Sequence, residues 1–427
     1  MDIRYIIINR LFGRFNHEIK ISDGVNIIIG DNGVGKTVCL KIINNIFNGD
    51  FGYLFELEFQ QIIISFGKEI WSITKCIESE DAIIVDDNGD VVLSQTVLHV
   101  DSNLKGLHEI KYADIHLDIP PYYEKISENE WVDRRRGFVI EETELLNRLG
   151  INKHTNKLPE WITKRINGIS VRLIDTQRIY RNEGRSPEIG RTISKYVKDI
   201  SVIIRHEQNR AGLIASRLDR TFPTRLVREL SENDKTTPAE TLNSLSEVDN
   251  LTHDLSLVGL TTYEKDTILK NLSHIDDAIL KVLSLYASDM KEKLNAYNDI
   301  QNKLQLFLDI INSRFKNKKC ILNRNQEFEF AAIDEEGRIR RAKTIAPTKL
   351  SSGEQNEFVL FYDLVFNCDK KNLILVDEPE LSLHIKWQQM MIGDLLRICE
   401  HNHLNIFIAT HSPDLIGNHW SLVQKLE

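Results

Sequence analysis

A glycine-rich segment near the start of the chain constrains its fold more than any other feature. The segment, Gly30–Thr37, reads GDNGVGKT and fits the spacing G-x-x-x-x-G-K-S/T. The apolar run Val25–Ile29 comes directly before it, and from Thr37 to about Phe47 the apolar residues recur at helical spacing. A strand, a glycine loop and a helix in this order predict a phosphate-binding loop, because the loop N–H groups and the helix N-terminus attract anions.

The residue types within this loop predict a role for each position. The backbone around Asn32, Gly33 and Gly35 is expected to turn its N–H groups towards the phosphates of ATP. Lys36 is expected to reach the β- and γ-phosphates, and the hydroxyl of Thr37 is expected to bind Mg²⁺. The alternative is a glycine loop that arose by chance, and the strand and helix on either side argue against it. The sequence therefore predicts ATP and Mg²⁺ as cofactors.

A second, acidic motif lies far along the chain. The apolar strand Leu373–Val376 ends in Asp377 and Glu378. A carboxylate at the end of a strand beside a phosphate loop can hold Mg²⁺ through water, and this role is assigned to Asp377. Glu378 is then placed to orient or deprotonate the attacking water. The alternative is a pair of solvated acids that cap the strand.

Strands and helices alternate in this part of the chain. We predict a helix from Ser352 to about Phe366, a strand at 372–377, a helix at about 384–400 and a buried strand at 405–410. Such alternation is typical of a largely parallel sheet covered by helices. Earlier segments between Phe55 and Leu93 are β-rich, and residues 328–345 predict a hairpin. The predicted fold class is therefore α/β, a mixed sheet with flanking helices and an antiparallel β subdomain.

Two further motifs complete a resemblance to the ABC-type ATPases, and among them to the SMC-like and OLD-like branch. Leu350–Gln355 is similar to the signature loop of that family, and Ile408–Ser412 is similar to its switch segment. The resemblance covers the two ends of the chain. It implies a P-loop ATPase head that dimerises head to tail, so that the signature loop of one copy contacts the γ-phosphate of ATP held by the other. The residues that carry this contact are Ser351, Ser352 and Gly353.

The same resemblance assigns roles to other positions. His411 resembles the switch histidine that senses the γ-phosphate, and Leu383-His384 lies where the family has its D-loop, at the dimer seam. Gln177 follows the strand-like Val171–Ile174 and is similar to the Q-loop glutamine that contacts Mg²⁺ and water. The implied catalytic residues are Glu378, His411 and Gln177, and the implied metal ligands are Thr37, Asp377 and Gln177.

The middle of the chain has a different pattern. Apolar residues recur at steps of three and four from Ile193 to Phe222 and again from Ile268 to Phe315, with Pro223 and the polar stretch Ser231–Pro238 as interruptions. We predict an antiparallel, coiled-coil-like helical hairpin. The alternative is an ordinary helical subdomain folded on itself. The expected division is 1–185 for the N-terminal part of the head, 186–322 for the insert and 323–427 for the C-terminal part of the head.

The length of this insert indicates which members of the ABC-type ATPases the chain resembles. More than 300 residues separate Thr37 from Ser351, whereas the two motifs lie much closer together in ABC transporters, so a transport ATPase is not expected. The given sequence ends at Glu427, shortly after His411, so the toprim nuclease domain of OLD nucleases is not expected. The chain therefore resembles the stand-alone ATPase subunits of anti-phage systems such as PARIS and Septu. That resemblance implies a homodimer or higher homo-oligomer and a separate effector, a nuclease or a toxin.

The amino-acid composition limits whether nucleic acid or a membrane is expected as a further partner. The net charge of −9 gives no overall attraction to nucleic acid, so DNA would need a local basic patch. Short basic runs occur at 134–136, 314–319 and 338–343, and they support the alternative of an SMC-like DNA-binding ATPase in repair or recombination. Such runs are more often solvated faces. No apolar run is long enough to span a membrane, and five scattered cysteines are typical of a reduced, cytoplasmic protein.

Overall fold

The computed structural model forms two compact units. It describes residues 3–77, 84–85, 91–92, 96–111, 122–127, 130–135, 138–141, 145, 158–175, 188–231, 237–263, 276–368, 373–381 and 383–426. The first unit combines Met1–Gln177 with Asp369–Glu427, and the second unit is Arg178–Cys368. Residues 323–368, which we expected in the C-terminal part of the head, group with the helical insert in the second unit. Within the described residues, no helix is long and apolar enough to cross a bilayer.

A five-stranded parallel sheet forms the centre of the first unit. All four pairings in it are parallel, as the alternation of strands and helices predicts. The strand order is β13 (Val171–Asp175), β17 (Leu373–Asp377), β18 (Asn405–Ala409), β3 (Val25–Ile29) and β19 (Val423–Lys425). The edge strand β19 is missing from the sequence prediction, because three residues with half-exposed side chains carry no readable alternation. The sheet thus joins strands from both ends of the chain.

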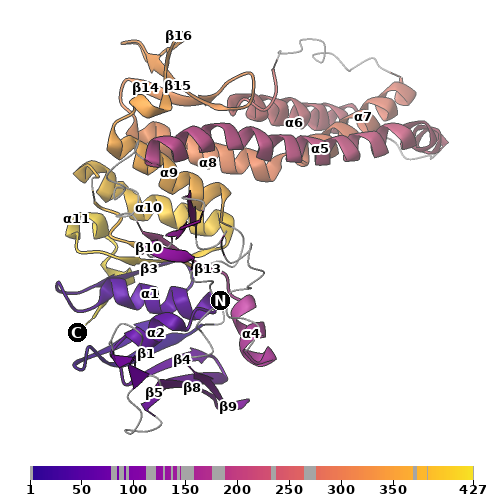
Figure 1. Cartoon of the computed structure of the whole chain (residues 1–427). Helices are drawn as coiled ribbons and strands as arrows, with labels where there is room; N and C mark the ends of the chain where they lie inside the picture. The colour runs from indigo at the N-terminus through magenta and orange to yellow at the C-terminus, as the bar shows by residue number, and fades with distance from the viewer. Residues whose placement is uncertain are drawn as a thin grey trace. The chain divides into compact units, whose positions relative to one another are not determined.

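Helix α1 (Lys36–Phe47) packs against this sheet through its apolar stripe. Cys39, Leu40, Ile43 and Ile46 are fully buried, which confirms the predicted helix. They share one core with the alternating residues Leu373 and Leu375 of β17 and with Phe407 and Ala409 of β18. Helix α10 (Ile385–Asn402) packs against β3 and β18. In Figure 1 the strands of the parallel sheet lie between α1 and α10.

A six-stranded antiparallel sheet completes the core of the first unit. Its order is β2 (Phe15–Lys20), β1 (Tyr5–Leu11), β4 (Gln61–Phe66), β5 (Glu69–Ile77), β8 (Thr96–Ser102) and β9 (Gly106–Lys111). The segment from Phe55 was expected to be β-rich, but Gly52–Glu56 forms the short helix α2. The reason is local, since the carboxylate of Asp50 accepts the Gly52 N–H at 3.1 Å and so starts a turn. The unit also contains β10 (Tyr123–Ser127), β11 (Glu130–Asp133), β12 (Phe138–Glu141), α4 (Glu160–Asn167) and α11 (Pro413–Ile416).

Four helices make up most of the second unit. They are α5 (Glu188–Ser231), α6 (Pro238–Leu257), α7 (Asp277–Asn295) and α8 (Asn298–Arg314). α7 packs against both α5 and α6, and the three helices lie side by side in Figure 1. Ion pairs join Arg217 to Glu292 and Arg225 to Asp289, so α5 and α7 run antiparallel as predicted.

One prediction about these helices is wrong. Pro223 was expected to interrupt the first arm, but it lies inside α5, which continues for eight more residues to Ser231. A proline in a helix interior costs about 3 kcal/mol, because it removes one hydrogen bond and crowds the preceding turn. The helix continues through Pro223 because α5 packs against α7, with ion pairs on both sides between Asp219 and Lys293 and between Arg225 and Asp289.

A small sheet and a buried helix complete the second unit. The strands β14 (Lys318–Leu322), β15 (Phe328–Ile333) and β16 (Ile339–Ile345) pair antiparallel, and the β15–β16 hairpin confirms the prediction for 328–345. Helix α9 runs from Ser352 to Phe366, also as predicted. Phe358, Phe361 and Tyr362 on this helix are almost fully buried. α9 is therefore a core helix of the second unit.

Candidate functional site

Three predicted motifs of the first unit meet at one edge of the parallel sheet. The strand register places Asp377 beside Ala409 and Ala409 beside Ile28. The glycine loop after β3, the acidic pair at the end of β17 and Thr410-His411 after β18 therefore leave the sheet at the same, carboxyl edge. Ligands of open α/β sheets bind at this edge.

The glycine loop has a backbone that only glycine adopts without strain. Gly33 has φ 87° and Gly35 has φ 92°, in the left-handed region. A Cβ on Gly35 would also lie 2.8 Å from Leu11 Cδ2, and a Cβ on Gly30 would lie 2.9 Å from Val34 Cγ2. The loop thus follows a path that lets a ligand approach its backbone closely. Asn32 and Gly33, two of the residues predicted to contact phosphate, are exposed.

The side chain of Lys36 lies at the centre of the site. It is 6% exposed, and its Nζ donates to the carbonyls of Gly30 at 3.0 Å and Asp31 at 3.2 Å. The ammonium also contacts both ring nitrogens of His411. Burial lowers the pKa of Lys36, and the nearby carboxylates, Glu378 first among them, act against this shift. The predicted phosphate-binding lysine and the predicted switch histidine are therefore direct neighbours.

A hydroxyl and a carboxylate meet where we predicted a magnesium site. The Thr37 hydroxyl donates to Asp377 Oδ2 at 2.8 Å, and Asp377 is only 4% exposed. Within the described residues, no group of three or more His, Cys, Asp or Glu side chains could enclose a metal. This donor set fits Mg²⁺, which is commonly bound by one or two protein oxygens together with substrate phosphates and water. The glycine path and the donor set together fit a magnesium nucleotide.

Glu378 follows Asp377 in an unusual conformation. Its φ of 46° lies in the left-handed region, which is uncommon for a residue with a side chain. The backbone N–H of Glu378 donates to the Ala409 carbonyl at 2.8 Å, so the ladder between β17 and β18 fixes this turn. Backbone strain of this kind is concentrated at functional sites. The carboxylate lies near enough to Lys36 to act on its pKa.

Glu380 is a site residue that the sequence analysis missed. Its Oε1 accepts the Thr410 hydroxyl at 2.6 Å and the His411 backbone N–H at 2.9 Å. The Thr410 hydroxyl in turn accepts the Ser412 N–H at 2.9 Å. Glu380 therefore connects the acidic motif to the segment that carries His411. The available indication was its place two residues after Glu378, across Pro379.

The predicted signature residues lie in the second unit, at the start of α9. Ser351 caps this helix, because its hydroxyl accepts the Glu354 N–H at 3.4 Å while Glu354 accepts the Ser351 N–H at 2.9 Å. Lys318 also donates to Glu354, at 2.9 Å. Ser351 and Ser352 are exposed at the positive end of the helix, and Gly353 is half-buried. Gln177 lies outside the described residues.

Several basic residues of the proposed DNA patches have other partners. Arg314 is buried and lies 2.9 Å from Glu357, with its guanidinium over the ring of Phe361. Lys318 is paired with Glu354, and Arg134 is paired with Glu124. Lys319 on β14 and Arg340 on β16 are exposed, and Arg338, in the turn before β16, is exposed and paired with Glu336. The basic surface is therefore smaller than the sequence indicates.

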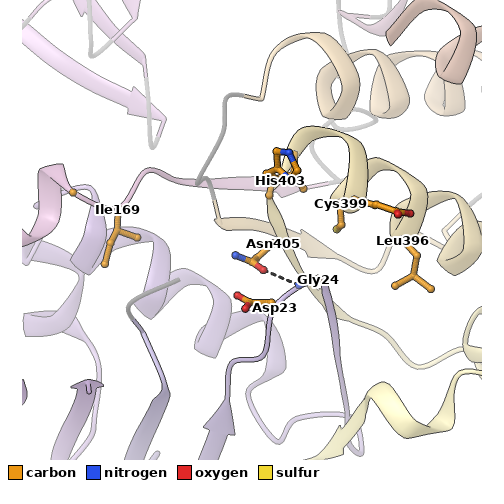
Figure 2. A pocket seen from close by; sticks show the side chains of 10 residues that line it. Asp23, Gly24, Ile169, Leu396, Cys399, His403 and Asn405 are labelled. Carbon is orange, nitrogen blue, oxygen red and sulfur yellow. Dashed lines mark hydrogen bonds between the residues drawn. The ribbon is translucent and has the colours of Figure 1, made fainter. Parts of the chain in front are cut away.

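A large cavity lies at the other end of the parallel strands. Its volume is about 720 Å³, and Figure 2 shows Gly24, Ile169 and Asn405 among its lining residues. Gly24 and Ile169 come just before β3 and β13, and Asn405 begins β18, so the cavity is at the amino edge of the sheet. Asn405 Oδ1 accepts the Gly24 N–H at 2.7 Å. None of the predicted site residues lines it.

Comparison with known proteins gives a family and distant structural likenesses, among them two SMC heads. The crystal structure of an SMC head bound to the C-winged helix domain of ScpA is 11% identical over 97% of this chain and 91% of that chain, with a TM-score of 0.35. The SMC head with an extended coiled coil bound to the C-terminal domain of ScpA, from Pyrococcus furiosus, is 12% identical over 97% and 90%, with a TM-score of 0.34. No curated protein matches the chain. Residues 1–416, in contrast, match the family described as AAA ATPase domain, so the chain belongs to that family of ATPases.

Proposed function

We propose that the chain hydrolyses ATP in a head-to-tail dimer with a second copy of itself, and that this cycle switches a separate effector, a nuclease or toxin, in anti-phage defence. The observation that carries the ATPase part is the meeting of Lys36, Thr37, Asp377 and His411 at one sheet edge. The defence part rests on the resemblance of the motif set and its insert to stand-alone defence ATPases. We further propose three regions: 1–185 and 323–427 as the head, and 186–322 as the insert.

Each residue of the site has a distinct task in this proposal. Bound Mg²⁺ would neutralise the phosphate charge that develops during hydrolysis. Thr37 and Asp377 hold the metal, and the glycine loop with Lys36 holds the phosphates. Glu378 takes a proton from the attacking water, and His411 contacts the terminal phosphate. Gln177 is proposed as an additional contact to metal and water.

The start of α9 is proposed to complete the site of the partner copy. Its exposed Ser351 and Ser352 hydroxyls stand at a helix N-terminus, where the backbone N–H groups and the helix dipole favour an anion. The capping box with Glu354 and the buried pair of Arg314 with Glu357 keep this end of the helix rigid. A rigid donor set of this kind suits recognition of a terminal phosphate.

A mixing experiment tests the head-to-tail arrangement. Lys36→Ala removes the phosphate lysine of a copy's own loop, and Ser352→Arg blocks the signature that the copy offers to its partner, so each variant alone is expected to be inactive. Mixed dimers contain one site in which both halves are intact. A one-to-one mixture is therefore expected to recover about a quarter of the wild-type phosphate release per protomer, because half of the dimers are mixed and each has one good site.

The control for this experiment is a mixture of either variant with the double variant Lys36→Ala/Ser352→Arg. In the mixture of Lys36→Ala with the double variant, no copy has an intact loop. This mixture should therefore stay inactive whichever copy supplies the signature. An inactive mixture of the two single variants, measured where both dimerise, would show that each copy completes its own site. That result would contradict the head-to-tail proposal.

A second candidate function is supported by the exposed cations of the β14–β16 sheet. Lys319 and Arg340 suit contact with a phosphate backbone, and so does Arg338 if it leaves its exposed partner Glu336. If the chain clamps DNA, duplex binding at low salt should increase with ATP, and Arg338→Gln/Arg340→Gln should reduce the salt dependence by about two charges. If the chain instead switches an effector, co-expression with the neighbouring reading frame should give toxicity that depends on Glu378 and not on Arg338 and Arg340.

A further inference from the structure

His17 is buried against the glycine loop. It lies on β2, where alternation turns His17 and Ile19 inward and leaves Asn16 and Glu18 exposed. Its ring is 1% exposed and its Nε2 lies 2.8 Å from the carbonyl oxygen of Val34. Val34 is the residue between the two left-handed glycines of the loop. A side chain from a different strand thus holds the phosphate loop between its two left-handed glycines.

The surroundings of the ring define its protonation state. A carbonyl oxygen accepts, so Nε2 carries the proton of this hydrogen bond. Nδ1 is buried and has no hydrogen-bond partner among the described residues. A second proton there would be a buried, unsatisfied donor with a positive charge, and burial accordingly lowers the pKa of His17. The ring is therefore the neutral Nε2–H tautomer, and it stacks on Phe15 with ring centroids 5.9 Å apart.

The hydrogen bond to Val34 also determines where the next N–H points. In a trans peptide the C=O of one residue and the N–H of the next point in opposite directions, and the described residues contain no cis bond. Fixing the Val34 carbonyl towards His17 therefore turns the Gly35 N–H to the opposite side. Within the described part of the chain, that N–H donates to no protein acceptor. Gly35, on one side of this peptide, offers little conformational resistance to a flip of the peptide.

We infer that His17 is a positioning residue for nucleotide binding: its Nε2–H holds the Val34 carbonyl so that the Gly35 N–H faces the phosphates. This inference rests on the proposed function, in which the loop binds a nucleotide. His17 does not touch the reacting atoms and acts through Val34. Its contribution is preorganisation, because a loop that is already oriented loses less conformational freedom when the ligand binds.

Two substitutions at this position separate the hydrogen bond from packing. His17→Gln places an amide N–H near the position of Nε2, whereas His17→Leu fills the space without a donor. For the full-length chain, ADP affinity by calorimetry is expected to fall about tenfold in His17→Leu, the usual size of one buried hydrogen bond, and to stay within about threefold of wild type in His17→Gln. In steady-state hydrolysis, KM for ATP should rise more than kcat falls in His17→Leu. Glu18→Gln, on the exposed face of the same strand, is the matched control and should bind ADP as wild type does.

The outcomes distinguish this inference from the proposed function. If the wild-type chain binds no ADP, the proposed function fails. If the wild type binds ADP and His17→Leu binds it equally well, the role of His17 fails and the proposed function stands. Equal losses in both variants would mean that the ring matters only for packing. Should His17→Leu not fold, the ¹⁵N shifts of the wild-type imidazole decide, since a proton on Nδ1 and none on Nε2 would overturn the inference.

Discussion

Glu378→Gln is expected to lower ATP turnover by at least about a hundredfold, which is the usual contribution of a positioned general base. The amide keeps the shape of the side chain but cannot take a proton from water. The fixed turn after β17 should persist, because the Glu378 N–H still donates to the Ala409 carbonyl. Nucleotide binding by the glycine loop should therefore remain. Phosphate release measures turnover, and light scattering with ATP should detect a dimer that no longer dissociates.

The matched control is Glu400→Gln, an exposed acid on α10 at the opposite edge of the sheet, beside the cavity of Figure 2. This variant should hydrolyse ATP like the wild type. Lys36→Ala gives the complementary result, because it removes nucleotide binding as well as turnover. Hydrolysis by Glu378→Gln at the wild-type rate would mean that another group activates the water, and the assignment of Glu378 would be wrong.

Breaking the buried pair of Arg314 and Glu357 is the second large effect that we expect. Both side chains are fully buried, and the pair joins the end of α8 to the first half of α9. Glu357→Leu leaves an uncompensated guanidinium in the core, and such a loss typically costs about 3–5 kcal/mol. Replacing both partners, as Arg314→Met/Glu357→Leu, should cost much less, because no buried charge is left without a partner.

Two optical probes can locate this destabilisation. All five tryptophans, at positions 71, 131, 161, 387 and 420, belong to the first unit, so their fluorescence in urea follows that unit. Far-UV circular dichroism receives a large share of its helical signal from α5–α8 of the second unit. Glu357→Leu should therefore shift the dichroism transition more than the fluorescence transition.

An exposed ion pair on α8 is the control for the buried one. Asp299→Asn breaks the pair with Lys303 and should change stability by no more than about 0.5 kcal/mol, because exposed i,i+4 pairs contribute little. If Glu357→Leu lowered stability no more than Asp299→Asn does, the buried pair would not be what holds α8 against α9. The same conclusion would follow if the double variant were as unstable as Glu357→Leu alone.

Local patterns in the sequence were sufficient for much of the fold. Helix α9 and strand β17 were predicted within one residue, since an N-cap serine and an uninterrupted apolar run define their ends. Elements that depend on distant partners were not predicted well. α5 passes through Pro223 because α7 packs beside it, and β19 is a strand only because β3 offers a free edge. The sequence close to Pro223 or to β19 does not show that α7 and β3 lie beside them.

The residues of the candidate site likewise divide into those that the sequence predicted and those that it missed. Lys36, Thr37, Asp377 and His411 were predicted from the sequence to share a site, because their chemistry is tied to motifs of fixed spacing. Glu380 and His17 act through hydrogen bonds to other segments, and a carboxylate or an imidazole carries no sequence mark of its acceptor or donor. A histidine at an inward position of an alternating strand was the only available indication for His17.

Because α5 is long, a small tilt at one end of this helix would move its other end much farther. Tyr196, near its start, donates to Asp363 on α9 at 2.7 Å and stacks on Tyr362. From this contact to Ser231 the helix extends about 50 Å, at 1.5 Å per residue. A tilt of about 5° around Tyr196 would therefore move the far end by about 4 Å, roughly the width of a side chain. Within the second unit, the length of α5 would thus amplify a slight tilt at α9 into a larger displacement at Ser231.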